Sequence, residues 1–194
     1  ADATHPEGNG GSDHGGEHAG GDPHTWTTPT NVMVWVDVVE TALVRHDPEN
    51  AESYRANAVA YQEQLQDLDV WIQDQIAQIT ESKRMLVTDH TTFTYFAARY
   101  GMRQVGTVIP GYSTMAQPSA QDLAALQDLI HKYGVKAVFV GQTASQTLAE
   151  RVAEDTGVQL VQLYTGSLTE PDGEAATYLA YMRANVNAIV RALR

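Results

Sequence analysis

The 194-residue sequence contains no cysteine, which excludes disulfides, thiolate zinc sites, iron–sulfur clusters and cysteine nucleophiles. Basic residues are also scarce, because 12 Lys and Arg stand against 24 Asp and Glu and give a net charge of -12. A chain of this charge repels a phosphate backbone, so we expect no nucleic acid partner. No apolar run approaches the ~18 residues of a membrane span. Only His, Asp, Glu and Met remain as possible metal ligands.

The composition is otherwise that of a folded protein, with 43% apolar and 8% aromatic residues. At this length we expect one domain, or one domain with part of another. The opening letters ADATHPEG lack the charged and apolar segments of a signal peptide. We therefore expect a soluble chain that, if it is exported, has already lost its export signal.

Residues 1–24 differ from the rest of the chain, since they hold four of the seven histidines, seven of the 15 glycines and no Lys or Arg. The four histidines are His5, His14, His18 and His24. Such a composition buries too little apolar surface to fold, so we predict a flexible acidic loop that binds or buffers metal. The letters HGGEH also match a metallopeptidase pattern, but the two glycines disfavour the helix that this pattern needs.

Two helices are predicted in residues 25–80. Thr28 and Pro29 make a helix start, and residues 31–46 are apolar on most faces, which predicts a buried helix. In residues 51–79, apolar side chains recur at steps of mostly three and four. This spacing predicts one long amphipathic helix of about 45 Å.

From residue 81 to the end, short apolar runs alternate with helical patterns. The expected strands are 85–88, 105–109, 137–140 and 160–163, and the expected helices are 92–100, 119–133, 146–156 and 175–193. This alternation predicts an α/β fold with a four-stranded, mainly parallel sheet and helices on both faces. We place this C-terminal lobe at residues 81–194, after the long helices.

Two histidines are candidates for a metal site. Ligands of a parallel sheet bind beyond the carboxyl ends of its strands, and His90 is the side chain at those ends best suited to metal or acid–base chemistry at neutral pH. His24 lies between a proline and a tryptophan where the acidic loop meets the first helix, so its neighbours hold it in place. The pattern predicts that His24 and His90 bind one divalent metal. His46 and His131, near helix ends, are expected to be structural or solvated.

Several motifs occur in a fixed order along the chain. They are Asp22-Pro23-His24-x-Trp26, Asp47-Pro48-Glu49-Asn50-Ala51-x-x-Tyr54, Thr88-Asp89-His90-x-x-Phe93-x-Tyr95-Phe96, Gln117-Pro118-Ser119-x-x-Asp122-Leu123, Gly134-Val135-Lys136-Ala137-Val138-Phe139 and Thr177-Tyr178-Leu179-x-x-Met182-Arg183. In this order the motifs resemble the ZnuA-like metal-binding receptors of zinc and manganese ABC importers. The resemblance runs from Asp22 to Arg194, nearly the whole chain.

The resemblance implies two α/β lobes joined by one long helix, with the metal held between the lobes. Residues 31–46 would be that helix, and the chain would contain the second lobe with only the tail of the first. The opening part of the first lobe, roughly a hundred residues, carries another histidine ligand in relatives and is then expected to be absent. Such a chain looks like a fragment, a cleaved product or an incompletely represented receptor.

Carried over residue by residue, the resemblance implies that His24 and His90 are the family's second and third ligands. Manganese-binding relatives often have a carboxylate where His90 stands, so the histidine favours zinc, with manganese as the alternative. Many relatives have an Asp ligand where this chain has Gly166, and commonly a Glu where it has Gly141. We expect water or a residue of the flexible loop to complete the coordination.

The implied function is capture of a divalent metal, in the periplasm or on the cell exterior with a lipid anchor, and delivery to the membrane permease of an ABC importer. The chain would not be an enzyme. Two alternatives are a zinc hydrolase with Asp89 as base and an adhesin-like surface protein. Metal retained on dialysis, without hydrolysis of esters, peptides or phosphate esters, would distinguish the receptor from both.

Overall fold

The computed structural model describes residues 21–113, 115–141 and 146–194. Most of the predicted acidic loop therefore lies outside the described residues, including His5, His14 and His18. The end of that loop, from Gly21 to His24, is described and leads into the first helices.

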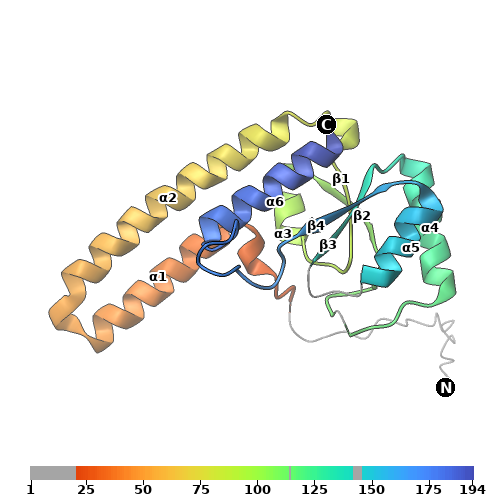
Figure 1. Cartoon of the computed structure of the whole chain (residues 1–194). Helices are drawn as coiled ribbons and strands as arrows, with labels where there is room; N and C mark the ends of the chain where they lie inside the picture. Colours follow the sequence, from red (N-terminus) through yellow and green to blue (C-terminus); the bar gives the residue numbers. More distant parts are fainter. Residues whose placement is uncertain (1–20, 114, 142–145) are drawn as a thin grey trace, which may run out of the picture.

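Within the described residues, the chain forms six α-helices, four strands and three short 3-10 helices (Figure 1). The α-helices are α1 (Pro29–His46), α2 (Ala51–Ala77), α3 (Thr94–Tyr100), α4 (Ala120–Tyr133), α5 (Gln146–Thr156) and α6 (Tyr178–Leu193). The strands are β1 (Met85–Thr88), β2 (Arg103–Thr107), β3 (Ala137–Gly141) and β4 (Gln159–Leu163). The 3-10 helices are η1 (Thr25–Thr27), η2 (Pro48–Asn50) and η3 (Glu81–Lys83). Every predicted helix and strand is present, and their ends differ from the prediction by no more than three residues.

The four strands form one parallel sheet in the order β2-β1-β3-β4, which confirms the predicted fold class. The second strand is displaced from its predicted position at 105–109. It begins at Arg103 and ends at Thr107. Met85, the first residue of β1, pairs with Arg103, so strand pairing rather than the apolar run sets where β2 begins. Val108 and Ile109 are buried just beyond the strand, and their amides donate to carbonyls at and just after the end of β1.

Helices cover both faces of the sheet, as the sequence alternation predicts (Figure 1). Helices α2, α3 and α6 contribute to the core on one face, and α4 and α5 to the core on the other. In β3, Ala137 and Phe139 belong to the first core, while Val138 and Val140 belong to the second. Successive residues of a strand point to opposite faces, so a strand covered on both sides is apolar at every position.

The predicted helix ends are also confirmed. At the start of α4, the Ser119 hydroxyl accepts from the Asp122 amide (3.2 Å), and the Ser119 amide donates to the Asp122 carboxylate (2.8 Å). Gly134 and Gly157 follow α4 and α5 with φ angles of 61° and 70°, in the left-handed region that favours glycine. None of the helices in the described part of the chain combines the length and apolar character needed to cross a membrane.

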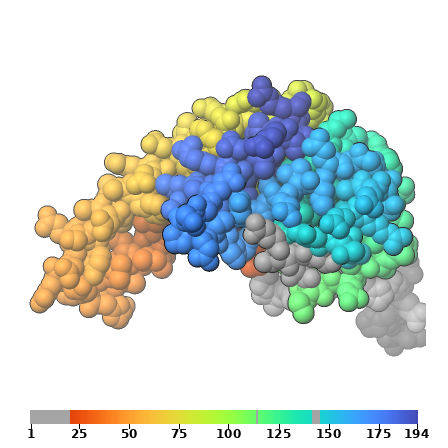
Figure 2. Space-filling model, in the orientation of Figure 1, coloured from red at the N-terminus to blue at the C-terminus, as the bar shows by residue number. Residues whose placement is uncertain are grey.

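The prediction that the helix of residues 31–46 is buried is wrong. In α1 only Pro29 and Val32 are buried. Five large apolar side chains of this helix are 41% to 64% exposed: Val34, Trp35, Val38, Val39 and Leu43. Helix α1 lies along α2, and the two helices form an arm that extends from the α/β body (Figures 1 and 2). Apolar content indicates which faces can be buried, but a neighbouring element is needed to cover them.

A buried carboxylate joins α2 to α3. Asp69 accepts hydrogen bonds from the Arg99 guanidinium (Nε 3.0 Å and Nη2 2.5 Å), the Tyr100 hydroxyl (2.7 Å) and the Gln73 amide (2.8 Å). Burial alone would raise the pKa of Asp69, but these donors favour the ionised form and hold the pKa below its usual value of 3.8. The charged carboxylate therefore stabilises the packing of α2 on the lobe.

We expect Asp69→Asn to lower the free energy of unfolding at pH 7 by about 1–3 kcal/mol, because the amide loses the charge that pairs with Arg99 and can point an N–H group at the buried Tyr100 hydroxyl. The pKa of Asp69 is lowered by folding, so the stabilisation is complete above its unfolded value and is lost as pH falls through the folded value. Urea unfolding should therefore show a smaller difference between variant and wild type in acid. Asp74→Asn, an exposed carboxylate on α2, is the control, and an equal loss at both pH values would contradict the prediction.

Candidate metal centre

His90 lies in the turn after β1, at the carboxyl edge of the sheet. From β1 the chain continues to β2 on one side and later to β3 on the other. In open parallel sheets, such a reversal of strand order creates a crevice where ligands bind. Backbone hydrogen bonds fix the turn, because the Asp89 amide donates to the Phe139 carbonyl (3.0 Å) and the Thr92 amide donates to the His90 carbonyl (2.8 Å). His90 itself is buried.

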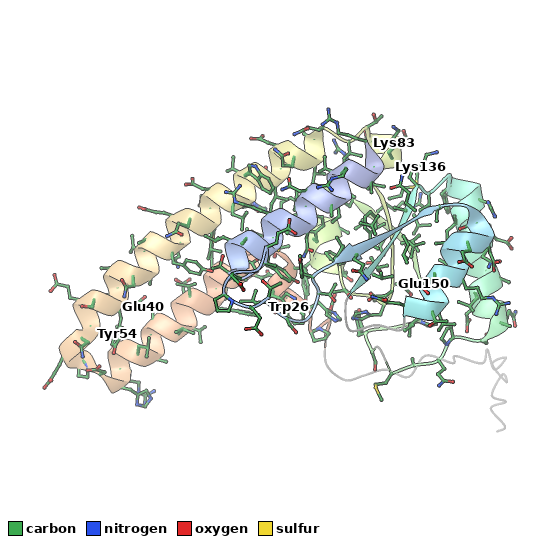
Figure 3. All side chains as sticks on the ribbon, viewed as in Figure 1. Trp26, Glu40, Tyr54, Lys83, Lys136 and Glu150 are labelled. Atoms are coloured by element: carbon green, nitrogen blue, oxygen red, sulfur yellow. The ribbon has the colours of Figure 1, made fainter. Side chains whose placement is uncertain are left out.

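His24 immediately precedes η1 and is also buried. Its neighbour Trp26, labelled in Figure 3, donates a hydrogen bond from Nε1 to the Thr165 carbonyl (3.1 Å). The Tyr178 hydroxyl donates to the Trp26 carbonyl (2.9 Å). Burial raises the pKa of Tyr181 to about 12, so its hydroxyl stays neutral and donates to the same Thr165 carbonyl (3.2 Å). These bonds attach the His24 segment to α6 and to the loop before it.

The structure brings the two predicted histidines together, although 66 positions separate them. Their Nε2 atoms lie 3.3 Å apart and their ring centroids 5.1 Å apart. Each Nδ1 faces a carboxylate, Asp22 Oδ1 at 2.7 Å from His24 and Asp89 Oδ1 at 2.8 Å from His90. Because an ionised carboxylate only accepts, each Nδ1 carries the proton and a neutral ring presents a lone pair at Nε2. Carboxylates often orient metal-binding imidazoles in this way.

The separation of the two Nε2 atoms suits a shared metal ion. Neutral imidazole binds zinc at ~2.0–2.1 Å, and two ligands of a tetrahedral ion at that bond length stand about 3.3–3.4 Å apart. The observed separation is 3.3 Å. Two facing lone pairs repel each other, and a cation between them removes the repulsion. The arrangement can therefore supply two corners of the coordination shell of a divalent cation.

Both carboxylate oxygens of Asp89 are already engaged. Oδ1 accepts from the backbone amide and Nδ1 of His90 (2.7 and 2.8 Å), and Oδ2 accepts from the Gly141 amide (2.8 Å). The residue is buried. Asp89 therefore orients the turn and the imidazole, which does not fit the role of general base in a zinc hydrolase.

Two further residues, Asp22 and Thr92, contact ring nitrogens of the predicted histidines. Asp22 orients His24, and its second oxygen, Oδ2, is buried without a hydrogen-bond partner in the described part of the chain. Thr92 places its hydroxyl 2.8 Å from Nε2 of His90. The spacing Asp-x-His was a usable signal, since it lets a carboxylate reach the neighbouring Nδ1. No local signal pointed to Thr92, because its direction depends on the turn.

Gly166, at the expected position of an Asp ligand, and Gly141, where the family resemblance implies a Glu, add no side chain. A Cβ atom on Gly141 would lie 2.0 Å from Thr165 Oγ1, so the close approach of Thr165 leaves no room for one. Gly166 follows Thr165 in the loop after β4. No group of three or more His, Cys, Asp or Glu side chains suited to a metal occurs among the described residues. His46 and His131 are exposed near the ends of α1 and α4, as expected.

Comparison with known proteins assigns the chain to a family. The family model described as zinc-uptake complex component A, periplasmic (ZnuA) matches residues 1–192. The chain belongs to the ZnuA family. Members of this family are solute-binding proteins, so the prediction that the chain is not an enzyme is confirmed.

Relatives in the ZnuA family are named for different metals. The manganese-binding lipoprotein MntA of Halalkalibacterium halodurans is 34% identical over 178 residues, which are 91% of this chain and 59% of that protein. The zinc-binding protein AdcA of Streptococcus pyogenes is 35% identical over 181 residues, 92% of this chain and 34% of that protein. The periplasmic zinc-binding protein TroA of Treponema pallidum superposes with a TM-score of 0.82 at 25% identity, covering 89% of this chain and 64% of that structure. The chain thus spans about a third to three fifths of the length of these curated relatives.

Proposed function

We propose that this chain is part of an extracytoplasmic receptor that captures zinc and delivers it to the membrane permease of an ABC importer. The observation that carries the proposal is the pair of Nε2 atoms 3.3 Å apart, each ring oriented by a carboxylate. Membership of the ZnuA family supports metal uptake, and the names of the relatives support a location in the periplasm or on a lipid anchor. The metal is the cargo, so the site has to hold it and give it up unchanged.

We propose zinc rather than manganese as the cargo because of the donor atoms that the site offers. Imidazole suits zinc, whereas manganese favours carboxylate and water oxygens. His24 and His90 both offer nitrogen, and the positions of Gly141 and Gly166 offer no carboxylate. Manganese is the alternative cargo, since a relative of similar identity is a manganese-binding lipoprotein.

Two imidazoles do not complete a tetrahedral shell. We propose that the further histidine implied for the first lobe of the receptor supplies a third ligand, and that water or a residue of the acidic loop of residues 1–24 supplies the fourth. A closed shell of this kind retains a metal, whereas an open position would serve hydrolysis. The adhesin-like alternative needs no metal at all, so metal retention separates it from the receptor.

The test is metal binding by the purified chain. After dialysis against a chelator, we expect calorimetric titration to show one zinc site, weaker than that of a two-lobed receptor because the first-lobe histidine is missing, and still weaker manganese binding. We expect no hydrolysis of esters, peptides or phosphate esters. X-ray absorption of the zinc-loaded chain should show at least two imidazole ligands. A chain that retains no zinc, or binds manganese more tightly than zinc, would contradict the proposal.

Gly166→Asp should strengthen metal binding, because it restores the carboxylate that many relatives use at this position. We expect a modest gain for zinc and a proportionately larger gain for manganese, the ion that prefers oxygen. Calorimetric titration of wild type and variant with both metals measures the gain, and Gly166→Asn is the control without the charge. Equal manganese affinity in the two proteins would mean that residue 166 does not face the metal.

A further inference from the structure

Besides His24, the Thr92 hydroxyl also contacts Nε2 of His90, the atom that would bind the metal. Thr92 Oγ1 lies 2.8 Å from His90 Nε2. Since Nδ1 of this ring donates to Asp89, Nε2 of the neutral ring accepts, and the Thr92 hydroxyl is then the donor. Thr92 is 1% exposed and His90 is 6% exposed, so this hydrogen bond is shielded from water.

This lone pair cannot serve a hydrogen bond and a metal ion together. An imidazole nitrogen without a proton has one lone pair in the ring plane, so metal binding at Nε2 has to break the bond from Thr92. The two histidines differ in this respect. Among the described residues, no hydroxyl or amide donates to Nε2 of His24, whose polar neighbour is His90.

Among the described residues, the other acceptor near the displaced hydroxyl is a poorer one. The His90 carbonyl lies 3.4 Å from Thr92 Oγ1. That carbonyl already accepts from the Thr88 hydroxyl (2.7 Å) and from the Thr92 amide (2.8 Å). A hydroxyl that turns toward it exchanges a short hydrogen bond for a long one. The metal-free protein therefore holds a hydrogen bond that the loaded protein gives up.

We infer that Thr92 lowers the affinity of the site and favours release of the metal, by capping the lone pair of His90 in the metal-free protein. The inference rests on the proposed function, since it requires the metal to bind His90. With Thr92 and Asp89 on its two nitrogens, the buried ring of His90 leaves no polar atom unpaired after the metal departs. A receptor that transfers its cargo benefits from a metal-free state stabilised in this way.

The first test replaces the hydroxyl. Thr92→Val keeps the branched shape and removes the donor. Zinc should therefore bind about 2- to 10-fold more tightly, which is the change in affinity that the net free energy of one hydrogen bond produces. Competition with a chelator measures the affinity and the rate of zinc release, which should fall. Thr92→Ser keeps the hydroxyl, and Thr91→Val removes one from the neighbouring residue; both should bind as wild type does. Unchanged or weaker zinc binding by Thr92→Val overturns the inference.

A second measurement keeps the two proposals apart. In the metal-free chain, the nitrogen NMR signal of His90 Nε2 should move on Thr92→Val, because its donor is lost, and it should coincide with wild type after zinc is added. Thr92→Ala takes the place of Thr92→Val if that variant does not fold. No movement in the metal-free spectrum overturns the inference, even if zinc binds. Failure of wild type to bind zinc overturns the proposed function, while the metal-free spectrum still reports on the hydrogen bond.

Discussion

His90→Ala is expected to lower zinc affinity at least about 100-fold and to leave the lobe folded. Removing an outer-shell partner alone typically costs about 10- to 100-fold in metal affinity, and a direct ligand contributes more. The backbone hydrogen bonds that fix the turn after β1 do not involve the imidazole, so the turn should persist. Chelator competition gives the affinity, and circular dichroism with thermal unfolding reports on the fold.

The matched control is His131→Ala, which removes an exposed histidine of α4 far along the chain from the site. It should bind zinc as wild type does. His24→Ala should match His90→Ala, and the double variant should be little worse than either, because one imidazole alone holds zinc weakly. Wild-type affinity in both single variants would assign the tight site to other residues, the histidines of residues 1–20 first among them.

Gly141→Ala is expected to destabilise the lobe by about 1–3 kcal/mol, the usual cost of an added group in a tightly packed place. The new Cβ would lie 2.0 Å from Thr165 Oγ1 and 3.1 Å from Asp89 Oδ2. Asp89 cannot move away without changing its hydrogen bonds to His90, so zinc affinity should fall in the same variant. Thermal unfolding with and without zinc measures both effects.

Thr165→Ala should partly rescue Gly141→Ala, because it removes the oxygen at 2.0 Å. In a double-mutant cycle we expect a coupling of about 1 kcal/mol or more, since the two residues are in contact. Gly21→Ala is the control, because no atom of the described residues lies within 4 Å of a Cβ at that position. Simple additivity of the two changes would show that the chain accommodates a side chain at residue 141 in another way.

Most of the fold could be predicted from the sequence, because its local signals agree with one another. Met85–Thr88 and Gln146–Thr156 have the predicted bounds, since turn residues and apolar periodicity delimit them together. Strand β2 could not be placed as well, because its bounds follow from pairing with β1. The burial of α1 was predicted wrongly, since a sequence shows the apolar faces of a helix and not the element that covers them.

The site was predictable only in part. His24 and His90 have local contexts that restrict them, and the structure places them side by side. Their role as metal ligands remains a prediction. The capping hydroxyl of Thr92 depends on the path of one turn, and the steric pairing of Gly141 with Thr165 joins residues of different strand ends. Contacts of this kind arise from tertiary packing, which leaves no trace in composition or periodicity.

The two imidazoles are attached to backbone segments that differ in how firmly neighbouring elements hold them. His90 follows β1, which has a hydrogen-bonded strand on each side, so we expect its surroundings to open mainly together with the sheet. His24 precedes a three-residue 3-10 helix at the margin of the lobe, where local opening requires less free energy. A metal bound to both can therefore escape when the His24 segment detaches briefly while the sheet stays intact. On the proposed function, the residence time of the metal would then be set by the attachment of the His24 segment, and the thermal stability of the lobe would be a poor guide to it.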